Sequence, residues 1–72
     1  MIYYRQFRVD DSVFGQPNPI KIIEESFLNT LASLKHDIIS DNKKFDRKRI
    51  KKETMPRVGN YTEFKITYDD GE

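Results

Sequence analysis

The sequence predicts an α+β fold: a single small domain in which one central amphipathic helix, at about residues 19–41, packs on a short, mainly antiparallel sheet. The helix is predicted because apolar residues recur every three or four positions along it, which places them on one helical face. The strands are predicted because residues 1–9 and 61–68 are rich in aromatic and β-branched side chains. One helix on one side of a small sheet buries both apolar surfaces, so residues 1–72 are expected to form one domain.

The amino-acid composition limits the cellular compartments and the kinds of chemistry that are expected for this protein. The chain has no cysteine, which excludes disulfides, thiolate chemistry and cysteine-based zinc sites. A chain without disulfides fits a reducing compartment. No segment contains the roughly 20 consecutive apolar residues that a membrane-spanning helix requires. We therefore expect a cytoplasmic protein that does not associate with membranes.

The first predicted strand, residues 1–9, has an apolar side. Because strand side chains alternate between two faces, its core-facing residues are expected at the odd positions. These residues are Met1, Tyr3, Phe7 and Val9. Residues 10–18 follow as a loop, since Gly15 and Pro17 interrupt both kinds of regular pattern.

The predicted helix has a signal at each end. Asn18 is a suitable N-cap, and Pro19 suits the first helical position, where its missing N–H costs no hydrogen bond. Asp41 and Asn42 are expected to end the helix. The apolar side chains between these ends share one face and are expected to join the core: Ile20, Ile23, Phe27, Leu31, Leu34 and Ile38.

Residues 43–56 form a basic segment whose conformation the sequence leaves open. Three conformations are compatible with the sequence: the segment extends the helix, it forms a strand, or it stays flexible. A turn signal follows it at Gly59–Asn60. A hairpin through this turn would pair residues 47–55 with 61–68 and give the element order β-α-β-β. The tail at 69–72 is expected to fray.

Charge is polarised along the chain. Residues 43–57 carry eight Lys or Arg and two acids, whereas the other residues carry five basic and ten acidic side chains. Clustered cations beside aromatic residues suit contact with a charged macromolecule. The candidate partner-binding residues are Lys43, Lys44, Phe45, Arg47, Lys48, Arg49, Lys51, Lys52 and Tyr61.

The leading functional interpretation is a small non-catalytic protein-interaction module of the regulator or inhibitor type. It would dock a protein through the basic segment and the nearby aromatic residues. Its size, high charge and lack of cysteine are typical of small proteins borne by phages and mobile elements. Small domains often complete a thin core by associating, so the partner considered includes a second copy in a homodimer.

The alternative interpretation is a small nucleic-acid-binding accessory protein in which residues 43–52 contact phosphates. In a third interpretation the basic run only keeps the domain soluble, as Lys-rich edge strands do. The same residues serve all three, so the sequence does not separate them.

Motifs for catalysis are weak. Glu63 and Lys65 have the acid-x-Lys spacing of the PD-(D/E)xK nucleases, but alternating polar residues on the solvent face of a strand give this spacing often. The single histidine, His36, lies near the end of the predicted helix, where cations are favoured, and points away from its neighbour Asp37. We therefore expect no enzymatic activity, no cofactor and no metal.

Overall fold

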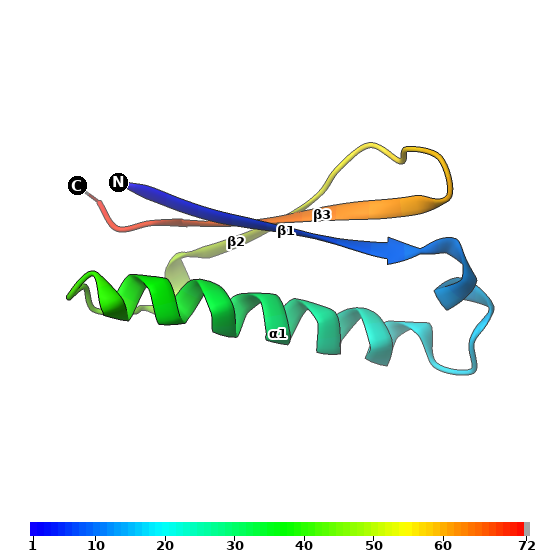
Figure 1. The fold of residues 1–72 in the computed structure, drawn as a ribbon, viewed down its shortest axis with the longest axis horizontal. Helices are drawn as coiled ribbons and strands as arrows, with labels where there is room; N and C mark the ends of the chain where they lie inside the picture. Colours follow the sequence, from blue (N-terminus) through cyan, green and yellow to red (C-terminus); the bar gives the residue numbers. More distant parts are fainter. Residues whose placement is uncertain (72) are drawn as a thin grey trace.

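The fold is one helix packed on a three-stranded antiparallel sheet, as the sequence predicts. The computed structural model describes residues 1–71. In Figure 1 the helix lies along one face of the sheet, and the two ends of the chain lie side by side. The strand order is β1-β3-β2, so β1 and β2 are the edges. The elements are β1 (Ile2–Asp10), α1 (Pro19–Ser40), β2 (Ile50–Thr54) and β3 (Tyr61–Asp69), with 3-10 turns at Asp11–Gly15 and Arg47–Arg49.

The register of the sheet decides which side chains face α1. Tyr3 lies opposite Tyr68 and Phe7 lies opposite Phe64, so the odd positions of β1 share a face with the even positions of β3. Ile50 of β2 also lies opposite Tyr68 and joins this face. The predicted core face of residues 1–9 is therefore confirmed at Tyr3, Phe7 and Val9, whereas Met1 is exposed.

Local signals set both ends of α1 where the sequence predicts them. The side chain of Asn18 accepts a hydrogen bond from the backbone nitrogen of Lys21 at 3.4 Å. At the other end Asn42 adopts a positive φ of 61°. Its nitrogen donates to the carbonyl of Ile39 at 3.0 Å, and the nitrogen of Lys43 donates to that of Ile38 at 3.2 Å. This pair of bonds is a Schellman motif, which turns the chain sharply out of the helix.

The core lies between α1 and the sheet and contains most of the predicted apolar face. Ile20 is the exception, because its side chain is 77% exposed. Ile20 lies in the first turn of α1, where it lines a surface depression with Lys52 of β2 and Phe64 of β3. The buried residues of the core are Tyr3, Phe27, Leu31, Leu34, Ile38, Ile66 and Tyr68.

Two segments, residues 10–18 and the tail at 69–72, have more structure than the sequence indicated, whereas the basic segment forms the strand of the expected β-α-β-β order. The loop at 10–18 contains a 3-10 turn, and Asp10 caps it by accepting a hydrogen bond from the nitrogen of Ser12 at 2.9 Å. The basic segment at 43–56 does not extend the helix; it runs irregularly from 43 to 46, makes a 3-10 turn and then forms β2.

The fraying expected at 69–72 is wrong for its first two residues. Asp69 is the last residue of β3, and the side chain of Asp70 is only 8% exposed. Asp70 is held because its carboxylate meets the Lys43 ammonium at 2.8 Å. Residue 72 lies outside the described residues.

Candidate functional site

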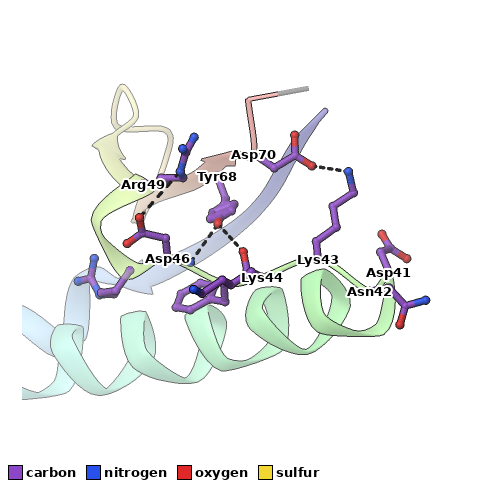
Figure 2. Close-up of a pocket in the computed structure, with 10 residues that line it drawn as sticks. Asp41, Asn42, Lys43, Lys44, Asp46, Arg49, Tyr68 and Asp70 are labelled. Atoms are coloured by element: carbon purple, nitrogen blue, oxygen red, sulfur yellow. Dashed lines mark hydrogen bonds and ion pairs between the residues drawn. The ribbon is translucent and has the colours of Figure 1, made fainter.

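The irregular start of the basic segment is fixed against the end of β3. The Tyr68 hydroxyl accepts a hydrogen bond from the backbone nitrogen of Asp46 at 3.0 Å and donates one to the carbonyl of Lys44 at 3.1 Å (Figure 2). Between these two residues, the Phe45 ring stacks on the Tyr68 ring with centroids 5.5 Å apart. The ring of Phe45 is therefore used in packing, although its position in the basic segment suggested a role in partner contact.

Acidic groups of the same chain approach several of the cations. Figure 2 shows the ion pair of Lys43 with Asp70 and that of Arg49 with Asp46, whose atoms lie 2.8 Å and 3.9 Å apart. The Arg49 guanidinium also donates to the carbonyl of Asp69 at 3.3 Å. The fold thus brings Asp70, from the acidic end of the chain, onto Lys43, while Arg49 contacts Asp46 of the basic segment itself.

A shallow hollow opens where α1 leads into the basic segment (Figure 2). Its lining alternates in charge, because Asp41, Asp46 and Asp70 lie among the cations. Within residues 1–71, no three His, Cys, Asp or Glu side chains are grouped closely enough to hold a metal ion. A lining of mixed sign does not select a ligand of one charge.

A second depression, which we call the α1–β2 groove, runs between α1 and the edge strand β2. Its lining is mostly apolar and consists of Ile20, Ile23, Glu24, Phe27, Lys52 and Phe64. Lys52 lines it because β2 pairs Lys52 with the buried Ile66, which turns the lysine side chain to the face that α1 covers.

Cations lie over aromatic rings along this groove. The Lys52 ammonium is 4.8 Å from the centroid of the Phe27 ring, and the Arg47 guanidinium is 5.5 Å from the same centroid. Lys35 of α1 lies 5.3 Å from the centroid of Phe45 in the same way. Such contacts orient a cation over the face of a ring. The side of the cation that points away from the ring stays available for contact with other groups.

The structure brings together only some of the residues that the sequence singled out. Arg47 and Lys52 both lie over the ring of Phe27, which lines the α1–β2 groove, and Phe45 packs against the core. Lys51 faces the uncovered side of the sheet, since it lies next to Lys52 on an alternating strand. Tyr61 also lies elsewhere, at the far end of β3, under the guanidinium of Arg8 at 4.4 Å.

The remaining candidates are spread around the segment. The side chains of Lys44 and Lys48 are exposed, whereas Lys43 and Arg49 take part in the contacts with acidic residues described above. The groove also contains residues that sequence reasoning did not assign to a site, among them Phe27 and Phe64. Phe27 was predicted as core, and only its place opposite Lys52 shows that its ring also lines a surface.

Two ionisable groups near the ends of β1 have shifted pKa values. The Tyr3 hydroxyl donates to the Asp41 carboxylate at 2.7 Å, and this bond, which favours the protonated phenol, raises the pKa of Tyr3 above 10.0. At Asp10 the hydrogen bond from the backbone of Ser12 favours the carboxylate and lowers the pKa below 3.8. Both shifts arise from structural contacts, and neither group lies in the groove.

Comparison of the chain with protein-family models, with characterised proteins and with solved structures finds no match. None of the helices within residues 1–71 is long and apolar enough to cross a membrane.

Proposed function

We propose that the protein is a non-catalytic protein-binding module and that its α1–β2 groove takes up an acidic, apolar segment of another protein. The observation that carries the proposal is the placement of Arg47 and Lys52 over the ring of Phe27 at the groove. A groove with an aromatic floor and a cationic rim is complementary to a segment that presents apolar side chains inward and carboxylates outward.

Exposed apolar side chains continue the groove along α1. Glu24, Leu28, Lys35 and Ile39 share one side of the helix, since they are separated by four, seven and four residues. Leu28 is 51% exposed and Ile39 is 52% exposed. Leu28 and Ile39 with Lys35 between them favour a ligand that is both apolar and acidic, whereas Glu24 at the other end of the row favours a cationic group there.

The backbone of β2 offers a second set of contacts. The Met55 nitrogen donates to the Glu63 carbonyl at 2.8 Å. This bond shows which residues of β2 direct their backbone N–H and C=O groups towards β3 and which direct them away. The backbone groups of Lys52 and Thr54 therefore point away from β3, at the free edge of the sheet. An extended ligand segment that pairs with this edge would direct alternate side chains into the groove.

Binding to phosphates is the less supported alternative. Nucleic-acid contact depends on cations that gather on one surface. Here Lys43 and Arg49 contact acidic residues, Lys51 faces the other side of the sheet, and Arg47 and Lys52 lie over an aromatic ring. This arrangement suits a carboxylate-bearing apolar ligand better than a nucleic-acid backbone.

The test is selection of ligands from a random-peptide display library, followed by affinity measurement with purified protein. We expect selected peptides in which Asp or Glu alternates with apolar residues. The charge-reversed variant with Arg47→Glu and Lys52→Glu should bind these peptides about tenfold more weakly or worse, which corresponds to about 1.4 kcal/mol. Lys51→Glu is the matched control, because it makes the same change on the opposite face of the same strand.

Three results would overturn the proposal: no enriched peptides, peptides that lack acidic residues, or equal binding to the charge-reversed variant. Labelled single- and double-stranded DNA and RNA provide the comparison for the alternative. Binding of these that falls by orders of magnitude between about 50 and 200 mM salt, with no peptide binding, would favour nucleic acid instead.

A further inference from the structure

The outer edge of β1 is a second surface with unpaired backbone groups. The Asp70 nitrogen donates to the Met1 carbonyl at 3.2 Å, and the Asp11 nitrogen donates to the Asn60 carbonyl at 2.8 Å. Along β1 the backbone N–H and C=O groups of successive residues point alternately towards β3 and away from it. These two bonds show that the groups of the odd-numbered residues point to β3. Those of its even-numbered residues point outward, where no described strand lies: Ile2, Tyr4, Gln6, Arg8 and Asp10.

Apart from Arg5, a charged residue on the face that α1 covers, this edge lacks the features that usually prevent strands from pairing. β1 is nine residues long, contains no proline or glycine, and pairs with β3 in an unbroken register without a bulge. The other edge, β2, has five residues, two of which are lysines. The lysines of a short edge discourage pairing with the same edge of a second copy, whose lysines would repel them, whereas long and regular edges invite such pairing. The side chain of Arg5 contacts one of the outward backbone groups, since it donates to the Tyr4 carbonyl at 3.0 Å.

The sequence of β1 is complementary to itself when two copies run antiparallel about Gln6. In that register every residue of Ile2–Asp10 has a partner. Tyr4 lies opposite Arg8 of the second copy on the uncovered face, and Arg5 lies opposite Phe7 of the second copy on the face of α1. Each pair occurs twice by symmetry. Both pairs place a cation beside an aromatic ring, and no like charges lie opposite each other.

Neighbouring registers are worse. Pairing centred on residue 5 would place Arg5 directly opposite Arg5 of the second copy, and like charges in that position are destabilising. Pairing centred on Phe7 would leave Ile2 and Tyr3 without partners. The register about Gln6 is therefore the one that uses the full strand.

The side of α1 nearest this edge leaves room for a second helix. Ser26, Thr30, Ser33 and Asp37 follow one another at steps of four, three and four, so they share a side of α1. Asp37 forms an ion pair with Arg5 of β1, which identifies this as the side towards the β1 edge. Three of the four side chains are small, and small side chains allow two helices to approach closely.

We infer that two copies of this chain associate through their β1 strands, antiparallel about Gln6, and join their three-stranded sheets into one continuous sheet. Association pairs the outward backbone groups and widens a sheet that is small for independent stability. The α1–β2 groove lies at the other edge of each copy, so this association and the proposed peptide binding do not compete.

The absence of cysteine allows a direct test of the register. Residues that exchange both hydrogen bonds across an antiparallel ladder have Cα atoms about 5.5 Å apart, which lies within the range that disulfides span. In Gln6→Cys the two introduced thiols should form an intermolecular disulfide in a glutathione redox buffer, in which oxidised glutathione is the oxidant. Thr54→Cys is the matched control, because it places a thiol on the free edge of β2.

We expect about tenfold more disulfide-linked dimer from Gln6→Cys than from Thr54→Cys, because association raises the effective concentration of the paired thiols. Sedimentation equilibrium should show a concentration-dependent dimer of the unmodified chain. Gln6→Pro should weaken it by about tenfold or more, since it removes the outward N–H. A chain that stays monomeric at about 1 mM would overturn the inference. So would a dimer in which the two cysteine variants cross-link equally, and this comparison remains decisive if the proline variant does not fold.

Discussion

The Tyr68 hydroxyl accepts a hydrogen bond from the backbone nitrogen of Asp46 at 3.0 Å, which connects the end of β3 to a segment 22 residues earlier in the chain. The same hydroxyl donates to the carbonyl of Lys44 at 3.1 Å. Both backbone groups lie in the stretch that joins α1 to β2 and has no regular structure of its own. Tyr68 therefore positions Arg47 and Lys52 indirectly, by fixing where the basic segment begins.

Tyr68→Phe should lower the free energy of unfolding by about 1–3 kcal/mol, because it leaves a partly buried donor and acceptor without their shared partner. Urea denaturation followed by circular dichroism measures the loss. Tyr4→Phe is the control, since the Tyr4 side chain is exposed on the uncovered face of the sheet. Equal losses in the two variants would contradict the role assigned to the Tyr68 hydroxyl.

Alkaline pH should weaken the contact between Tyr3 and Asp41. The carboxylate of Asp41 raises the pKa of Tyr3 above 10.0 in the folded protein, so folding favours the protonated phenol. The stability that this gives is fully present below the unfolded pKa of about 10 and is lost as pH rises through the folded pKa. Tyr3→Phe should therefore show a smaller alkaline loss of stability than the unmodified protein.

Difference absorbance of tyrosinate gives a second measurement of this pKa. Tyr3 should ionise at higher pH than an ordinary tyrosine, and the Asp41→Asn variant should bring its pKa closer to 10. A tyrosinate titration that Asp41→Asn leaves unchanged would show that the hydrogen bond does not persist in solution.

The elements of the fold were predictable because they depend on periodic patterns. The spacing of apolar residues and the caps at Asn18 and Asn42 define α1, and alternation defines β3. The path of residues 43–49 was not predictable, because its contacts are with distant residues. Tyr68 and Asp70 are 20 or more positions away and hold it in place.

The residue types of the candidate site were predictable from the sequence, but their arrangement in space was not. The sequence identifies the cations, yet the 3-10 turn at Arg47–Arg49 interrupts the alternation that would have assigned their faces. Whether Lys51 or Lys52 faces α1 depends on the register of β2 with β3. The role of Phe27 as the surface beneath two cations depends on the crossing of α1 and β2, which no local pattern specifies.

Asp70→Asn should destabilise the protein although it hardly changes the shape of the side chain. The carboxylate lies 2.8 Å from the Lys43 ammonium and 3.0 Å from the amino nitrogen of Met1, and it is mostly shielded from solvent. Removing its charge should cost about 1.5–3 kcal/mol, the range for hydrogen bonds that involve charged groups. Thermal and urea unfolding measure the change. Glu25→Gln, at an exposed position on α1, should leave both nearly unaltered.

Two glycines should respond to alanine in opposite directions. Gly59 has a φ of +60° in the tight turn between β2 and β3, where the Tyr61 nitrogen donates to the Val58 carbonyl at 3.3 Å. Gly59→Ala should therefore cost about 1–2 kcal/mol of unfolding free energy. The Cβ atom that Gly15→Ala adds meets no atom within 4 Å, and Gly15 has no positive φ. This substitution should therefore be neutral or should raise the free energy of unfolding by up to about 1 kcal/mol. A loss at Gly15 that matches the loss at Gly59 would show that the φ angle is not the cause.

Lys52→Gln should separate ligand binding from folding. The ammonium of Lys52 lies 4.8 Å from the Phe27 ring centroid, and an exposed contact of this kind contributes about 0.5–1 kcal/mol. The unfolding free energy should thus fall by less than about 1 kcal/mol, while peptides selected on the unmodified protein should bind less well. Lys51→Gln, on the other face of β2, should change neither quantity. If Lys52→Gln instead unfolds the domain, the lysine holds α1 and β2 together, and weaker peptide binding by the variant would report on folding rather than on the groove.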